Sequence, residues 1–165
     1  KSRNNETILI KKDTGPLFFN TKISGPLNDF MEATKELKSY EGMSYLWDDE
    51  RERARVKQRT AVLDANFAIK SAKPEVQYIA CAEISANNAF GATVSNRYIF
   101  VVDKDTKEVL AYSDVDDDFM LKAFALYYAQ TGNDIEQDKY GNYKIDKMSF
   151  GMQCVFAKSL DDIKE

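Results

Sequence analysis

The sequence predicts one α+β domain over residues 1–165, in which an antiparallel sheet packs on one long amphipathic helix, with a second, shorter helix. Three observations lead to this prediction. Strand-like runs follow one another through hairpin turns, and one segment keeps a helical period from about residue 49 to about residue 71. No β–α–β alternation, internal repeat or low-complexity linker divides the chain. A length of 165 residues is also sufficient for one hydrophobic core.

Two strands are expected near the N-terminus. Residues 7–11 and 17–23 are rich in apolar and β-branched side chains, and residues 13–16 between them combine Asp, Gly and Pro as turns do. Residues 24–26 indicate a second break. Residues 27–37 fit a short helix, because their apolar side chains fall on one side of it, but a strand there remains open.

The clearest predicted element is the long helix of residues 49–71. Acidic residues at its start and Lys70 near its end suit the helix dipole, and Pro74 forbids its continuation. Small and apolar residues recur in it at an approximate helical period, namely Ala54, Val56, Thr60, Leu63, Phe67 and Ala68.

Three antiparallel strands are expected after this helix, at residues 76–84, 98–102 and 108–112. A loop over residues 85–91 would join the first two, and residues 103–107 read as a hairpin turn between the last two.

The remaining chain is expected to form a helix, a polar connection and a final strand. The helix starts within residues 113–116 and ends at Gly132, a common C-terminal stop. Residues 133–143 form the connection, with a turn near its end, and residues 147–156 form an apolar strand. Ser159 then caps a short terminal helix.

Composition narrows the range of activities. The chain contains no histidine, which removes Ser-His-Asp and Cys-His triads, imidazole acid–base catalysis and zinc sites that need histidine. A formal net charge of −4 makes nucleic acid an unlikely partner. No run approaches 18 apolar residues, as a transmembrane helix would need. We therefore predict no catalytic residue, no cofactor and no metal site.

The first residues predict a trimmed start. The chain begins at Lys1 rather than Met, and residues 1–6 are polar, as in a flexible leader end or a linker. Removal of a signal peptide or lipoprotein leader would explain this start and would place the protein in the cell envelope or outside the cell. An excised domain of a cytoplasmic protein would explain it too.

The two cysteines allow two interpretations. Cys81 and Cys154 both lie in strand-like runs, so they would be able to form a disulfide if those strands were neighbours. Two buried free thiols that pack as small hydrophobic groups fit the same sequence.

The segment of residues 78–91 is the first candidate for a binding site. An apolar strand pattern carries Cys81 and Glu83, and then breaks at Asn87 and Asn88 before Gly91. One reading makes Glu83, Asn87 and Asn88 a small polar site at a strand end. The other makes Glu83 an exposed residue and the two asparagines a turn, because Asn tolerates left-handed backbone.

This segment resembles a motif of small uncharacterised bacterial proteins, many of them lipoproteins or other envelope proteins. Their pattern reads Cys-Gly-Glu-Val-Asn-Ala-Lys-Asn-Ser-Phe-Gly-Gly, and the likeness covers about 20 residues, from Cys81 to Phe100. The chain departs from it at Ala82, Ser85 and Ala92, and residues 72–75 replace an expected Asp-Pro-Asp-Ser-Ala-like stretch. The resemblance implies a periplasmic or secreted bacterial protein and no known activity.

Two charged groups are further candidates. Arg51, Arg55 and Arg59 form a stripe on the long helix that suits phosphates or an acidic partner, although neighbouring acidic residues favour a solvated face with internal ion pairs. Asp114 and Asp116–Asp118 do not fit a calcium loop, because Phe119 and Ala125 stand where Gly and Glu are required. Charge at a helix N-terminus is the favoured role there, with a loose metal site as the alternative.

The aromatic residues Tyr45 and Trp47 precede the long helix and would favour a recognition surface if exposed. The sequence as a whole favours a non-enzymatic envelope or secreted module that binds a protein or a cell-surface ligand, in an unknown oligomeric state. One alternative is a glycosidase-like hydrolase that uses Glu83 and one of Asp114–Asp118. The other is an intracellular regulator that binds anions or nucleic acid through the arginine stripe.

Overall fold

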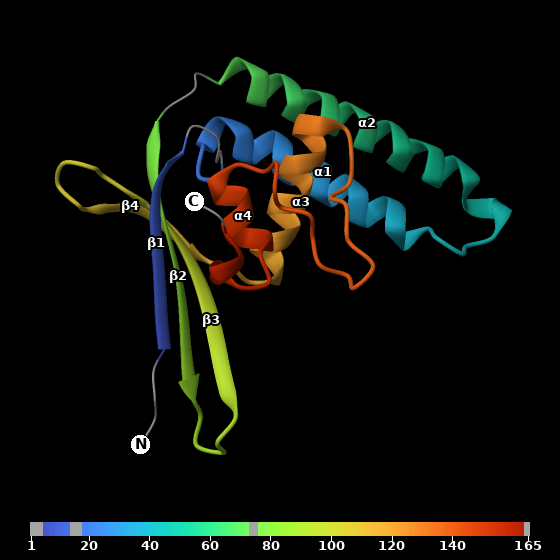
Figure 1. Ribbon diagram of the computed structural model, residues 1–165. Helices are drawn as coiled ribbons and strands as arrows, with labels where there is room; N and C mark the ends of the chain where they lie inside the picture. Colours follow the sequence, from blue (N-terminus) through green and yellow to red (C-terminus); the bar gives the residue numbers. More distant parts are fainter. Residues whose placement is uncertain (1–4, 14–17, 73–75, 164–165) are drawn as a thin grey trace. The chain divides into compact units, whose positions relative to one another are not determined.

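The computed structural model describes residues 5–13, 18–72 and 76–163 (Figure 1). Within these residues the chain is an α+β protein, with four antiparallel strands in one sheet and four α-helices. It divides into two compact units. Unit 1 comprises Lys1–Pro16, Pro74–Met120 and Glu136–Glu165, and unit 2 comprises Leu17–Lys73 and Leu121–Ile135. The predicted single domain and the packing of the sheet on the long helix stay predictions.

The sheet of unit 1 has the strand order β1-β2-β3-β4. Its strands are β1 (Asn5–Asp13), β2 (Gln77–Asn87), β3 (Thr93–Val102) and β4 (Val109–Asp114). All neighbours are antiparallel, and the register aligns Leu9, Cys81, Ile99 and Ser113 in one row across the sheet.

Two sequence predictions for these strands need correction. The predicted loop of residues 85–91 is wrong at its start, because β2 continues to Asn87 and leaves a short turn before β3. The predicted leader end of residues 1–6 is wrong at Asn5 and Glu6, which pair with β2. Residues 1–4, like residues 14–16 of the predicted turn, lie outside the described part of the chain.

Helix α4 (Phe150–Phe156) contacts β1, β2 and β3 and covers one face of the sheet (Figure 1). The prediction of a strand at residues 147–156 is therefore wrong. The segment is apolar on nearly every side, and all its residues except Gln153 are buried, so its sequence has no period that separates a helix from a strand. Ser149 caps the helix and accepts from the Met152 N–H, while Asp13 at the end of β1 accepts from the Gly151 N–H at 2.8 Å.

Unit 2 contains α1 (Thr21–Ser39) and α2 (Asp48–Ser71), which run side by side in opposite directions (Figure 1). The predicted long helix is confirmed, and the open segment of residues 27–37 is helical. The strand predicted at residues 17–23 is wrong, because the helix begins at Thr21 under an Asn20 cap; Leu17 lies outside the described residues.

The predicted break at residues 24–26 is also wrong. Pro26 lies inside α1, although proline removes a backbone donor there. Burial of one helix face offsets this cost, since Ile23 and Leu27 on either side of the proline are fully buried.

Helix α2 buries its alanines rather than its larger apolar residues. Ala54, Ala61 and Ala65 are buried. Val56, Leu63 and Phe67, which share the predicted apolar period, are 50%, 68% and 74% exposed. Alanines allow two helix backbones to approach closely, so they form the contact with α1.

Helix α3 (Asp117–Thr131) begins after Asp116, whose side chain accepts from the Phe119 N–H at 2.8 Å. It ends at Gly132, which has the positive φ of 74° expected of a glycine stop. Lys122 in this helix donates to the Phe18 carbonyl, and burial lowers the pKa of its ammonium group. The last element, a 3₁₀ turn at Leu160–Asp162, begins with the predicted Ser159 cap.

Candidate functional site

Glu83 on β2 is bound by Arg97, which lies opposite it on β3. Arg97 donates to Glu83 Oε2 from Nη2 at 2.7 Å and from Nε at 3.2 Å. The two side chains are only 21% and 14% exposed. The carboxylate is therefore neutralised by a cation that donates two hydrogen bonds to one of its oxygens, and it faces an arginine rather than a second carboxylate.

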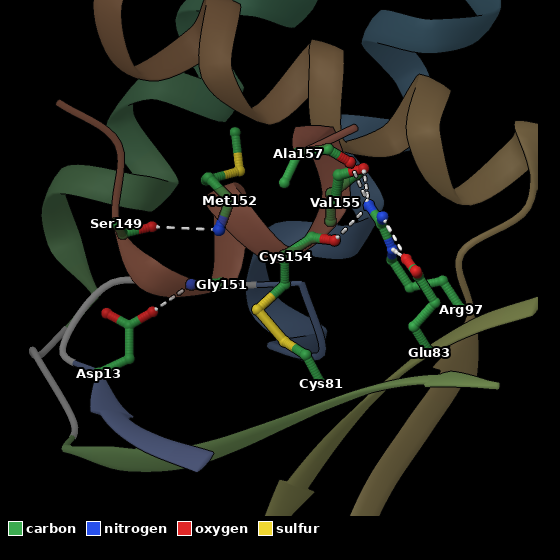
Figure 2. Close-up of a disulfide and its surroundings, with 10 residues drawn as sticks. All are labelled: Asp13, Cys81, Glu83, Arg97, Ser149, Gly151, Met152, Cys154, Val155 and Ala157. Atoms are coloured by element: carbon green, nitrogen blue, oxygen red, sulfur yellow. Dashed lines mark hydrogen bonds and ion pairs between the residues drawn. A yellow bond between two sulfur atoms is a disulfide. The ribbon is translucent and has the colours of Figure 1, made fainter. Parts of the chain in front are cut away.

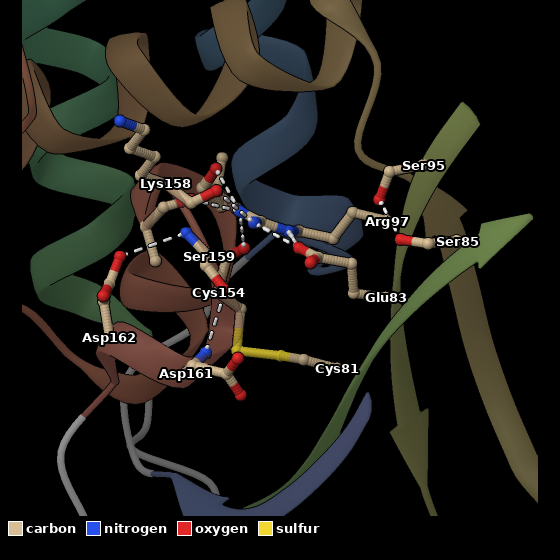
Figure 3. Close-up of polar contacts among 12 residues, drawn as sticks. Cys81, Glu83, Ser85, Ser95, Arg97, Cys154, Lys158, Ser159, Asp161 and Asp162 are labelled. Atoms are coloured by element: carbon tan, nitrogen blue, oxygen red, sulfur yellow. Dashed lines mark hydrogen bonds and ion pairs between the residues drawn. A yellow bond between two sulfur atoms is a disulfide. The ribbon is translucent and has the colours of Figure 1, made fainter. Parts of the chain in front are cut away.

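The same guanidinium group holds the end of α4 (Figures 2 and 3). Arg97 donates to the carbonyls of Cys154 at 3.1 Å and Lys158 at 3.2 Å, and also to that of Ala157. The last carbonyls of a helix lack partners within the helix and favour a positive charge beside them. Arg97 therefore joins the sheet to the C-terminal end of α4.

A disulfide joins the sheet to α4 two rows from the Glu83–Arg97 pair. Cys81 on β2 and Cys154 on α4 are bonded, with their Cα atoms 6.1 Å apart and a sequence separation of 73 (Figure 2). Both residues are fully buried. Of the two interpretations of the cysteines, the structure has the disulfide, although Cys154 lies on a helix and not on a strand.

A cleft of about 660 Å³ opens beside this network in unit 1. Glu83 and Arg97 line it, together with Ser85 and Ser95, whose hydroxyl groups are hydrogen-bonded at 3.1 Å (Figure 3). The polar connection predicted for residues 133–143 supplies another part of the wall, including Asn142. The polar groups at the floor of the cleft are thus bonded to one another.

The loop beside the cleft is organised by Asp138. Its carboxylate accepts from the backbone N–H groups of Tyr140 at 2.8 Å and Asn142 at 3.0 Å, and Gly141 has a φ of 82°. The hydrogen bond from Asn142, followed by that from Tyr140, holds the pKa of the Asp138 carboxyl below its usual range. This carboxylate therefore stabilises a turn.

Asn87 and Asn88 do not join Glu83 in a site. Asn87 accepts from the Thr93 hydroxyl at 3.2 Å, and Asn88 accepts from the backbone N–H groups of Phe90 and Ala92. Neither asparagine lines the cleft. Asn88 therefore forms the turn, Asn87 is the last residue of β2, and Glu83 is bonded and largely covered.

The arginine stripe on α2 is engaged in local contacts. Arg55 and Arg59 both pair with Glu52, at 3.3 and 3.7 Å. Arg51 donates to the carbonyls of Tyr40 and Ser44, each at 3.1 Å, and so clamps the connection between α1 and α2. These contacts match the solvated face with internal ion pairs.

Tyr45 and Trp47 lie in a 3₁₀ turn (Tyr45–Trp47) before α2. Tyr45 is 79% exposed and Trp47 is 43% exposed, and Trp47 stacks on Tyr40 with ring centroids 5.9 Å apart. The structure therefore places these two candidates at the surface, on a different unit from Glu83.

Asp114 points away from Glu83. It pairs with Tyr98 on β3, and Tyr98 follows Arg97 directly, so Asp114 lies on the opposite face of the sheet from the Glu83–Arg97 pair. Asp116 caps α3. Within the described residues, no group of three or more Asp, Glu or Cys side chains is placed to hold a metal ion.

The sheet face turned away from α4 carries a group of apolar side chains that the sequence analysis missed. We call it the open face. Tyr98, Phe100 and Tyr112 stack in a ladder across β3 and β4, with ring centroids 6.4 and 6.1 Å apart. Ile8 and Ile10 on β1 are 53% and 65% exposed, and Tyr112 is 67% exposed. The sequence indicates this face at residues 8–10, where consecutive apolar residues place apolar side chains on both faces of one strand.

No family model, curated protein or solved structure matches the chain. The resemblance of residues 81–100 to the bacterial envelope motif therefore stays a prediction. None of the helices in the described ranges combines the length and the apolar character that a membrane crossing requires.

Proposed function

We propose that this protein is a non-enzymatic, disulfide-stabilised module of the cell envelope or the secreted fraction, and that it binds a protein through the open face of its sheet. The observation that carries this proposal is the exposure of Ile8, Ile10 and Tyr112 beside the Tyr98–Phe100 ladder. Contiguous exposed apolar surface is characteristic of sites that bind proteins, and tyrosine is enriched among the residues that contribute most to such binding.

The disulfide supports the proposed compartment. Cysteine pairs persist mainly in oxidising environments such as the periplasm or the extracellular space, whereas cytosolic thiols are kept reduced. The bond between Cys81 and Cys154 is buried and links two elements of unit 1, as structural disulfides do.

The two alternative functions receive less support. A retaining or inverting glycosidase needs two carboxyl groups that face one cleft, but Glu83 is bound by Arg97 and Asp114 lies on the other face of the sheet. An anion site on α2 would need free guanidinium groups, but Arg51, Arg55 and Arg59 each have a carboxylate or carbonyl partner.

Site-specific photo-crosslinking tests the proposal in cells of the source organism. A benzophenone amino acid replaces Tyr112 on the open face, and the same group replaces Tyr140, which is 77% exposed, as a control elsewhere in unit 1. The proposal predicts a discrete protein adduct from position 112 that is lost when Ile10 is changed to Glu, and no such adduct from position 140. An absence of adducts at position 112 would contradict it.

A third position examines the other exposed aromatic surface. The crosslinker at Tyr45 reports on the Tyr45–Trp47 turn, which the sequence also suggested as a binding surface. An adduct from position 45 without one from position 112 would move the binding surface from the sheet to unit 2.

A further inference from the structure

The pattern of side chains on the open face reads nearly the same in both directions along the strands. The centre of this pattern is the row that contains Leu9 on β1 and Cys81 on β2. One row to either side, Ile8 matches Ile10 on β1, and Tyr98 matches Phe100 on β3. Ala82 and Ala80 match each other between them on β2.

Two of the three charged side chains on the open face follow the same symmetry with opposite sign, while the third, Asp114, has Tyr112 as its counterpart across the central row. Among the described strand residues, those on the open face are Glu6, Lys12 and Asp114. Glu6 and Lys12 are exposed, and each lies three residues from Leu9 on the edge strand β1, in opposite directions. A two-fold axis that crosses the strands at the central row would bring Glu6 of one copy onto Lys12 of the other.

We infer from this pattern that the partner on the open face is a second copy of the chain, packed sheet on sheet about a two-fold axis perpendicular to the strands. This inference rests on the proposed function, because it names the occupant of the same surface. The axis places Ile8 against the partner's Ile10 and Tyr98 against the partner's Phe100, and it closes two Glu6–Lys12 pairs at the rim. Such an isologous contact uses one patch twice and leaves no open end.

The size of the face places the expected dimer among small, weak interfaces. Four strands about 4.8 Å apart, over the seven residues from Glu6 to Lys12, give a face of roughly 450 Å² per copy in projection. Two copies bury roughly 900 Å² in this measure, close to the lower limit of about 1,000–1,200 Å² for specific interfaces. A dimer of micromolar dissociation constant is therefore expected.

Sedimentation equilibrium of the purified, oxidised chain tests the inference, from about 1 μM to about 500 μM. The expected result is a concentration-dependent rise from the 18.8 kDa of one chain to twice that mass. Ile10→Glu is expected to weaken the dimer by about 100-fold or more, because it buries an unpaired charge twice in each dimer. Leu63→Glu, an equally exposed site on α2, is the matched control and is expected to leave the dimer unchanged.

Charge reversal tests the axis without an apolar substitution. Glu6→Lys and Lys12→Glu are each expected to weaken self-association about tenfold, since each places like charges together twice. A mixture of the two variants is expected to recover the wild-type affinity, because both rim pairs of the mixed dimer are then opposite in charge.

Three outcomes overturn the inference. One is a monomer at every concentration, another is a dimer that survives Ile10→Glu, and the third is a mixture of charge variants that associates no better than either alone. Circular dichroism of each variant confirms that a loss of association is not a loss of folding. A monomeric purified chain that still gives a crosslink from position 112 to a different protein would reject the second copy while the proposed function stands.

Discussion

Replacement of Arg97 by Met should destabilise the protein strongly, because one guanidinium group serves both the sheet and α4. Methionine keeps most of the apolar stem and removes the donors. Glu83 then loses both of its charged hydrogen bonds, and the carbonyls of Cys154 and Lys158 lose their donor. The change tests whether this network stabilises unit 1.

The size of the expected loss in unfolding free energy follows from how deeply Glu83 and Arg97 are buried. Breaking a fully buried ion pair costs about 3–5 kcal/mol, and an exposed pair costs about 0–1 kcal/mol. Glu83 and Arg97 retain 21% and 14% exposure, so water reaches the abandoned carboxylate in part. We therefore expect the free energy of unfolding to fall by about 2–4 kcal/mol.

Urea denaturation at neutral pH measures this loss as a lower midpoint with an unchanged slope. Arg55→Met is the matched control, since Arg55 pairs with Glu52 at 3.3 Å but is 51% exposed, and we expect a change within about 0.5 kcal/mol. Glu83→Gln completes a double-mutant cycle with an expected coupling of about 1–2 kcal/mol. A loss at Arg97 no larger than the loss at Arg55 would refute the reasoning.

Three further predictions use the same unfolding measurement. Reduction of the Cys81–Cys154 bond, which spans 73 residues, should lower the free energy of unfolding by about 2–4 kcal/mol, so an unshifted urea midpoint under reducing conditions would contradict a structural disulfide. Asn88→Ala should lower the free energy of unfolding by about 1 kcal/mol, because the turn loses two hydrogen bonds, and should leave crosslinking from position 112 unchanged. Loss of the adduct in this variant would indicate that Asn88 belongs to the binding site. Because the backbone hydrogen bonds hold the pKa of Asp138 in the folded state below the 3.8 of an unperturbed aspartate, the stability that this carboxylate contributes is complete above that pH and is lost as the pH falls through the folded-state pKa. Melting temperatures between about pH 5 and about pH 2 should therefore fall more steeply for the wild type than for Asp138→Asn, and parallel curves would count against this role.

The candidate site could be predicted only in its parts. Glu83 stands out in the sequence as a carboxylate in an apolar strand, but its partner Arg97 lies 14 residues away and meets it only through the register of β2 and β3. Arg97 carries no local signal, since an arginine just before the apolar run of residues 98–102 resembles any exposed cation. The open face was missed because it depends on which side of the sheet α4 covers.

The elements that the sequence alone determined are those specified by local interactions. The helix α2 follows from its period, its acidic first turn and the proline after it, and the hairpin between β3 and β4 follows from its turn residues. Gly132 and Ser159 end and begin elements because backbone conformation and capping need only neighbouring residues.

Tertiary structure decided the elements whose sequence fits two conformations. Residues 150–156 are apolar except for Gln153, and they form α4 because a helix there places Cys154 on Cys81 and its last carbonyls on Arg97. Pro26 is held within α1 because burial of the helix face outweighs the local penalty. Contacts between distant residues have no period in the sequence, so the disulfide, the Arg97 network and the open face required the fold itself.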